Sequence, residues 1–218
     1  MAALGGAGLR SMRRRYQQVD DPATLARWLD EAAVGRLATV DEDGYPVVKP
    51  VSFVYSDGRI YFHSAREGEK LDDIRRDGRV GFEVDKLIAI TSPVERGCQV
   101  GCFYQSIVVR GRARILDGDA DRPLRERALR LLVRKHAPAF AEAPLDDEDR
   151  ATVVEVTVER ITGKEALGQL WPAERKLAVA RQLLARDGAA AAETIARMGL
   201  TLGQVRGDRG QAEDQSIV

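Results

Sequence analysis

Three short β-rich runs, separated by two tight turns, constrain the fold of this chain more than any other feature. The runs are 36–40, 47–55 and 60–63. The turns between them contain Asp43-Gly44 and Asp57-Gly58, dipeptides that are typical of two-strand hairpins. Three consecutive antiparallel strands form a meander, which opens many β-barrels and β-sandwiches. Because Pro50 lies within the second run, this strand is expected to be an edge strand or to be bulged there.

Helices are expected before and between the remaining strands. Asp21 is a suitable cap for a helix with Pro22 in its first turn, and this helix is expected to end at Gly35. Further helices are predicted over 68–76 and 121–136, and further strands over 79–84, 103–116 and 151–161. Segment 86–101 is predicted to be a loop with at most a short strand near 87–90. The last strand alternates in polarity, so one of its faces is expected to be exposed.

This order of elements predicts a mainly β (α+β) fold, an antiparallel barrel with peripheral helices. Residues 1–18 are predicted to be a flexible leader and 19–163 the barrel domain. Residues 164–206 are expected to form a C-terminal helical extension, and 207–218 a disordered tail.

Composition excludes several classes of protein. The formal net charge is zero, which does not favour nucleic acid or an anionic membrane surface as a partner. No apolar run approaches the ~18 residues of a membrane-spanning helix. The N-terminus lacks the basic start of a signal peptide, since Arg13 to Arg15 follow its small apolar residues instead. Two cysteines do not make a disulfide framework, so a cytoplasmic location is expected.

The sequence lacks the common phosphate-binding and metal-binding motifs. There is no G-x-G-x-x-G after a strand, no G-x-x-x-x-G-K-[ST] and no H-E-x-x-H. Only two histidines are present, and Cys98 and Cys102 do not assemble four ligands with their neighbours. We therefore expect free thiols and no metal site.

The most informative segment runs from 60 to 76, where a strand passes directly into a short helix. Free backbone N–H groups and the positive dipole end at a helix start attract anions. Ser64 offers a hydroxyl there, Arg66 can bind two anion oxygens at once, and Lys70 lies about one turn later. The segment therefore suggests an anion site, although a capped surface helix with solvated charges would show the same pattern.

Two further strands carry side chains that suit a flat cofactor. Lys49 shares a strand face with Val47 and Val51, so its charge needs either a partner or exposure. Tyr104 and Ser106 share a face of a later strand, where an aromatic ring and a hydroxyl could stack on and bond to a planar ligand. An ordinary half-buried strand explains either pattern taken alone.

Together these stretches resemble the pyridoxamine 5′-phosphate oxidase-like FMN-binding split barrels, and within them the nitroimidazole-resistance (Nim-type) flavoproteins. The similar segments cover about residues 12–160 and are, in order, 34–46, 61–65, Gly68 with Lys70-Leu71, 79–84 and 104–111. The resemblance implies a six-stranded antiparallel split β-barrel that binds FMN at the interface of a homodimer.

Carried over by position, the resemblance implies three groups of cofactor-binding residues. Those along the flavin ring are Lys49, Pro50, Val51 and Ser52. Those near the phosphate and ribityl chain are His63, Ser64 and Lys70, to which the physical argument adds Arg66. Those approaching from the later strand of the same or the second subunit are Tyr104, Gln105 and Ser106. His63 is also implied to be an active-site, and so catalytic, residue.

The resemblance implies an FMN-dependent oxidoreductase that reduces a small-molecule electrophile of the nitroaromatic or quinone type. Oxidation of vitamin B6 is not expected, because no histidine follows His136 and the C-terminal part is an Ala-rich helix. The alternative is a non-catalytic protein that binds a flavin, a deazaflavin or haem on the same barrel.

Overall fold

The computed structural model describes residues 12–91, 100–145 and 152–207, and the chain divides into two compact units. The first unit consists of residues 1–85 and 106–164, and the second of residues 86–105 and 165–218. Most of the predicted leader, Cys98 and nearly all of the predicted tail lie outside the described residues.

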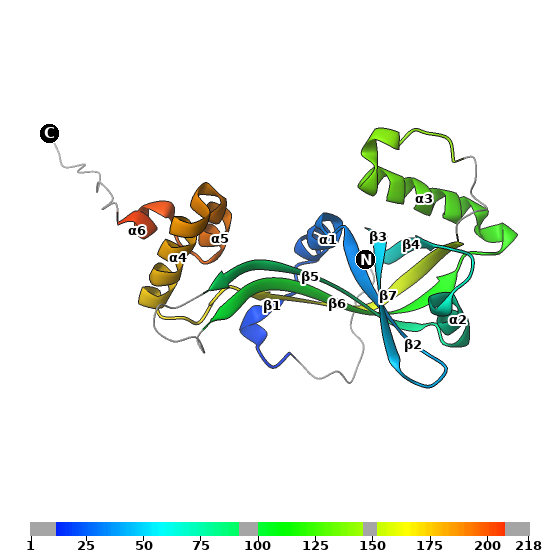
Figure 1. Ribbon diagram of the computed structural model, residues 1–218, viewed down its shortest axis with the longest axis horizontal. Helices are drawn as coiled ribbons and strands as arrows, with labels where there is room; N and C mark the ends of the chain where they lie inside the picture. The colour runs from blue at the N-terminus through cyan, green and yellow to red at the C-terminus, as the bar shows by residue number, and fades with distance from the viewer. Residues whose placement is uncertain (1–11, 92–99, 146–151, 208–218) are drawn as a thin grey trace. The chain divides into compact units, whose positions relative to one another are not determined.

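The described strands form one seven-stranded sheet in the order β1-β7-β4-β3-β2-β5-β6. Strand β6 pairs again with β7, so the sheet returns on itself (Figure 1). The strands are β1 (Gln18–Val19), β2 (Val34–Val40), β3 (Pro46–Ser56), β4 (Arg59–Ser64), β5 (Arg79–Thr91), β6 (Gly101–Ile115) and β7 (Thr152–Ala166). The antiparallel β2–β3–β4 pairing confirms the predicted meander, and the architecture confirms the split β-barrel. The strand in excess of the predicted six is the two-residue β1, which pairs with the end of β7.

The helices are α1 (Pro22–Glu31), α2 (Glu69–Arg76), α3 (Arg122–His136), α4 (Ala173–Asp187), α5 (Ala192–Arg197) and α6 (Leu202–Arg206). Asp21 caps α1 as predicted, since its carboxylate accepts the Thr24 backbone N–H at 2.9 Å. Within the described ranges, no helix combines the length and the apolar character needed to cross a membrane.

The core of the first unit fills the inside of the sheet. Leu25, Trp28 and Leu29 from α1, and Leu71 and Ile74 from α2, join the inward residues of the strands in one buried cluster. Such burial supplies most of the stabilisation of a fold of this kind.

Gly35 lies inside β2 and does not end α1, so the predicted boundary was wrong. A Cβ at this position would lie 2.0 Å from the Phe82 ring. That ring packs edge-on against Phe53, with ring centroids 4.9 Å apart. The glycine therefore makes room for a core aromatic ring. Strand β2 begins at Val34, two residues earlier than the predicted run.

Helix α3 covers the outer face of β3 and β4, as Figure 1 shows. Ala128 and Leu132 pack there with Val54, Tyr61 and Val153. The prediction that the last strand has one exposed face was therefore wrong for its first half. Residues 153–156 of β7 are all buried, because α3 covers one face and the barrel core covers the other.

The second unit contains the far ends of β5, β6 and β7 together with α4–α6. Its core combines Ala89 and Phe103 from the strands with Val179, Leu183 and Ile195 from the helices. The strand expected near 87–90 is present, but residues 86–91 continue β5 and do not form a separate short strand within a loop.

Candidate functional site

The junction between β4 and α2 contains a buried hydroxyl with no partner. Ser64 ends β4, faces inward and is 7% exposed. Its Oγ makes no hydrogen bond to any described group. Five residues later α2 begins at Glu69, preceded by Gly68 with φ of 133°, a conformation that favours glycine. A buried polar atom without a partner is rare, so Ser64 is suited to bind a ligand at this junction.

Lys49 extends from β3 toward the same helix. It lies opposite the buried Leu37 of β2 and on the inward face that Val51 shares. Its Nζ lies 2.8 Å from Glu69 Oε2 and 3.9 Å from Asp73 Oδ2, and its side chain is 23% exposed. The contact with Glu69 is an ion pair by distance, but Nζ has no partner with hydrogen-bond geometry.

Asp73 is the fixed member of this group. Its buried carboxylate accepts a hydrogen bond from Thr39 Oγ1 at 2.6 Å and another from Arg76 at 2.8 Å. Burial alone would raise the pKa of Asp73, but the hydrogen bonds from Thr39 and Arg76, with the charge of Lys49, hold the pKa below its ordinary value. Arg76 also donates to the Val40 carbonyl, so Asp73 and Arg76 together tie α2 to β2.

We call Thr39, Lys49, Glu69, Asp73 and Arg76 the α2 cluster. Ser64 belongs to the same end of the first unit. The β3–β4 pairing ends at Phe53 opposite Phe62, and both Lys49 and Ser64 lie beyond that pair on the inward faces of their strands. Lys49 reaches α2 through its ion pair with Glu69, and Ser64 precedes α2 by a short link. Both residues therefore lie near the start of α2.

The predicted flavin-ring residues divide between the two faces of β3. Lys49 and Val51 face inward, and Val51 is part of the barrel core. Pro50 and Ser52 face outward and are exposed, as is His63 on β4. Alternation along a strand requires this division, so a ligand on the outer face would contact Pro50, Ser52 and His63 but not Val51.

The outer face of β2 and β3 is apolar and uncovered in the described part of the chain. Val34, Val40 and Val48 are 49%, 47% and 58% exposed, respectively. Residues Val34 and Ser52 are paired across the two strands, as are Ala38 and Val48. An exposed apolar face of this kind commonly marks an interaction surface.

The third predicted group, on β6, lies where the chain passes from the second unit to the first, between residues 105 and 106. Tyr104 and Ser106 are half-buried on one face of β6. Gln105 is buried on the other face and accepts a hydrogen bond from Arg197 of the second unit at 3.0 Å. Tyr104 and Gln105 belong to the second unit, so the geometry of the first unit does not include them in the α2 cluster.

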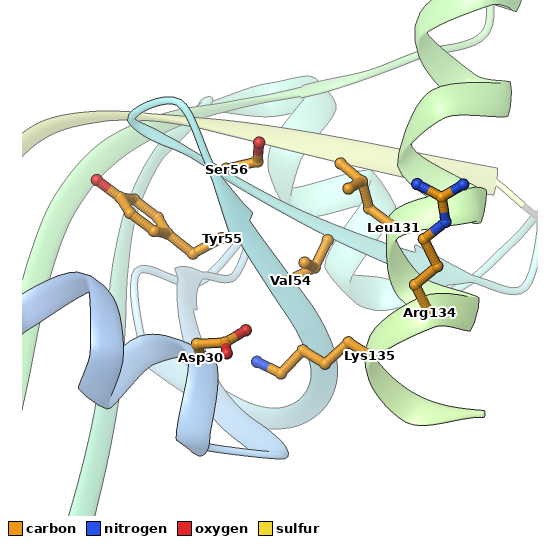
Figure 2. A pocket seen from close by; sticks show the side chains of 7 residues that line it. All are labelled: Asp30, Val54, Tyr55, Ser56, Leu131, Arg134 and Lys135. Carbon is orange, nitrogen blue, oxygen red and sulfur yellow. The ribbon is translucent and has the colours of Figure 1, made fainter. Parts of the chain in front are cut away.

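A cleft of about 440 Å³ lies elsewhere in the first unit (Figure 2). It is lined by Asp30 of α1, by Val54, Tyr55 and Ser56 of β3, and by Leu131, Arg134 and Lys135 of α3. The amine of Lys135 donates to the Leu29 carbonyl at 2.9 Å and lies 4.1 Å from the centre of the Phe53 ring. None of the predicted flavin residues lines this cleft, and its lysine is already engaged in joining α3 to α1.

Burial lowers the pKa of Lys135, although the charge of Asp30 opposes that shift. No group of three or more His, Cys, Asp or Glu residues that could hold a metal ion occurs in the part of the chain that the structure describes.

The sequence predicts Lys49, Ser64 and Lys70 as site residues, but that prediction does not include the acidic half of the α2 cluster. Glu69 and Asp73 are four residues apart, which places them on one face of a helix. That spacing directly after the proposed anion site was the available signal. The buried partner of Asp73, Thr39, could not be found in this way, because it lies on another element 34 residues away.

Comparisons with known proteins agree with the fold. The model of a family described as pyridoxamine 5′-phosphate oxidase matches residues 21–165. No curated protein matches the chain. Among solved structures, a protein from Bacteroides thetaiotaomicron, provisionally described as a 5-nitroimidazole antibiotic resistance protein, is 20% identical with a TM-score of 0.56. That match covers 68% of this chain and 86% of the other.

Two other solved structures share the fold. The flavocytochrome Anf3 from Azotobacter vinelandii is 18% identical with a TM-score of 0.61, and the match covers 72% of each chain. An FAD-binding protein from Mesorhizobium loti is 26% identical with a TM-score of 0.50, and the match covers 69% of this chain and 97% of the other.

Proposed function

Since this chain belongs to the pyridoxamine 5′-phosphate oxidase family, we propose that it is a homodimeric FMN-binding flavoprotein. The observation that carries the proposal is the pair of buried polar atoms without hydrogen-bond partners, Ser64 Oγ and Lys49 Nζ, beside the start of α2. The matched range, 21–165, contains every residue of this candidate site. The FAD-binding protein that shares the fold supports a flavin as the ligand.

The residues at the junction fit a phosphate group. The Ser64 hydroxyl can donate a hydrogen bond to it, and the ammonium groups of Lys49 and Lys70 supply positive charge. Arg66 is exposed one residue beyond Ala65 and can reach an anion from the solvent side. The free N–H groups of the first turn of α2 complete the set.

The part of the outer face of β3 and β4 that α3 leaves exposed suits the flavin ring and a second copy of the chain. Pro50, Ser52 and His63 are exposed there. The apolar face formed by Val34, Val40 and Val48 needs a cover, and in our proposal the second subunit provides it. Tyr104 and Ser106 would approach the ring from β6, in the same or in the second copy, whereas Gln105 would support them from the opposite face.

We infer that the protein is an oxidoreductase that acts on a small electrophile such as a nitroaromatic compound or a quinone. A bound flavin supplies hydride transfer, and the protein supplies binding, orientation and electrostatics. His63 is exposed beside Ser64 and is the titratable side chain best placed to give a proton to the reduced substrate. The likeness to the provisional 5-nitroimidazole resistance protein supports this substrate class. The cysteine content favours action in the cytoplasm.

A second candidate function is the binding of haem or a deazaflavin on the same barrel. The likeness to a flavocytochrome favours the haem alternative. Of the two histidines, His136 is hydrogen-bonded to the Phe53 carbonyl at 2.9 Å, so His63 would have to be the haem ligand.

The absorbance spectrum of the purified protein tests the proposal. We expect flavin absorbance, FMN as the ligand identified by mass after release, and a dimer by light scattering. A colourless protein that takes up no FMN, FAD or riboflavin would refute flavin binding. A Soret band after haem addition, without flavin uptake, would establish the second candidate instead. If the protein binds FMN, its reoxidation by a nitroaromatic compound or a quinone after chemical reduction tests the catalytic part.

A further inference from the structure

We propose that Glu69 is a specificity-determining residue that competes with the flavin phosphate for Lys49. This inference rests on the proposed function, because it concerns the same anion site. The Glu69 carboxylate lies 2.8 Å from Lys49 Nζ, in the place of the countercharge that a bound phosphate would provide.

The two acidic partners of Lys49 differ in how firmly they are held. Asp73 is 3% exposed in its side chain and is fixed by Thr39 and Arg76, so it stays in place. The Glu69 side chain is 55% exposed and lies at the first position of α2. A rotation about its side-chain bonds can move its carboxylate into water at little cost. Glu69 is therefore the partner that an incoming phosphate displaces.

The exchange keeps the charge of Lys49 compensated throughout. A largely buried ammonium needs a nearby negative group, and loss of its only partners would be costly. Asp73 Oδ2 lies 3.9 Å from Nζ and is held in place by Thr39 and Arg76, so Glu69 or the phosphate would supply the closer contact. Binding of phosphate thus breaks one ion pair while it forms another, which lowers the net gain from the phosphate.

This competition affects only ligands that carry a phosphate. Riboflavin places no charged group against Lys49, so it leaves the ion pair with Glu69 intact. Glu69 therefore lowers the affinity for FMN relative to the affinity for riboflavin.

Flavin titrations of the full chain, followed by quenching of flavin fluorescence, test the proposal with Glu69→Gln. The substitution keeps the shape of the side chain and removes its charge. We expect FMN to bind roughly three- to tenfold more tightly than to the wild type, and riboflavin to bind within about twofold of the wild type. Glu67→Gln is the matched control, because Glu67 is exposed, two residues earlier and outside the α2 cluster.

A second readout uses inorganic phosphate and does not depend on flavin. We expect phosphate to raise the thermal unfolding midpoint of Glu69→Gln more than that of the wild type or of Glu67→Gln. The inference is overturned if Glu69→Gln behaves like Glu67→Gln in both experiments, if it weakens FMN binding, or if it tightens riboflavin equally. If the wild type binds no flavin, the proposed function fails, and the phosphate experiment alone then decides whether Glu69 occupies an anion site.

Discussion

Two lysines contact the core of the first unit, and their surroundings differ in a way that separates structural from ligand-binding roles. The ammonium of Lys135 donates to the Leu29 carbonyl and faces the Phe53 ring. The ammonium of Lys49 has ion-pair partners in Glu69 and Asp73 but no hydrogen bond. Lys135 is thus fully engaged in joining two helices, whereas Lys49 can exchange a partner.

The same difference extends to the surroundings of each lysine. The cleft beside Lys135 has a volume of about 440 Å³, yet the nearby Ser56 hydroxyl donates to Asp57 at 3.0 Å. The junction beside Lys49 contains the unpartnered hydroxyl of Ser64. We therefore propose the ligand site at the junction on the ground of its unsatisfied polar groups and not on the size of a hollow.

The largest expected effect concerns Asp73, the fixed member of the α2 cluster. Asp73→Ala leaves Thr39 and Arg76 without their carboxylate and should lower the free energy of unfolding by about 3–5 kcal/mol. Urea unfolding at neutral pH measures this loss. Asp72→Ala is the control, since its side chain is 66% exposed and should cost less than about 1 kcal/mol. Equal losses for the two variants would show that Asp73 does not hold α2 in place.

Replacing Lys49 should affect ligand binding far more than stability. Lys49→Met removes one charge-assisted contact to phosphate, worth about 1.5–3 kcal/mol, so FMN affinity should fall about ten- to a hundredfold. Stability should change by less than about 1 kcal/mol, because Asp73 keeps Thr39 and Arg76. Fluorescence titration and urea unfolding of the same sample test both parts. Unchanged FMN affinity would remove Lys49 from the site.

Replacing Lys135 should affect stability more than FMN affinity. Lys135→Met loses the hydrogen bond to Leu29 and the contact with the Phe53 ring, which together should cost about 1–2 kcal/mol of stability. FMN affinity should stay within about twofold of the wild type, because the residue lies outside the proposed site. A marked loss of FMN affinity without a loss of stability would reverse the roles that we assign to the two lysines.

The smallest expected effect is on the pH dependence of stability. The pKa of Lys135 is lower in the folded protein than its ordinary value of 10.5, because burial disfavours the charged form. At a pH between the pKa of Lys135 in the folded protein and its ordinary value, the unfolded state binds more protons than the folded state. The free energy of unfolding therefore rises with pH in this window. Unfolding free energies measured in that range should therefore rise in the wild type relative to Lys135→Met. A constant difference between the two proteins would show that the ammonium is not desolvated.

The strand-rich half of the fold could be predicted because its signals are local. The turns at Asp43-Gly44 and Asp57-Gly58 determine which strands become neighbours, and the structure pairs β2 with β3 and β3 with β4. The errors came from tertiary packing. Gly35 ended a helix in the prediction, but in the structure it makes room for Phe82. Glu155 was predicted to face solvent, but in the structure it is 4% exposed.

The candidate site could be predicted only in part for a similar reason. Ser64 and Lys70 flank one strand–helix junction, so the sequence places them close together. The ion pair of Lys49 with Glu69 joins a strand to a helix and depends on the way α2 packs against the barrel. The face of Gln105 follows from strand alternation, but its partner Arg197 is 92 residues away and could not be predicted.

A crystal structure of the protein with FMN tests the central claim most directly. The account predicts the FMN phosphate at the β4–α2 junction, with oxygens about 3 Å from Ser64 Oγ and from Lys49 Nζ. The flavin ring is expected against Pro50, Ser52 and His63. A phosphate bound in the cleft beside Lys135, or a flavin ring that contacts neither β3 nor β4, would contradict the account.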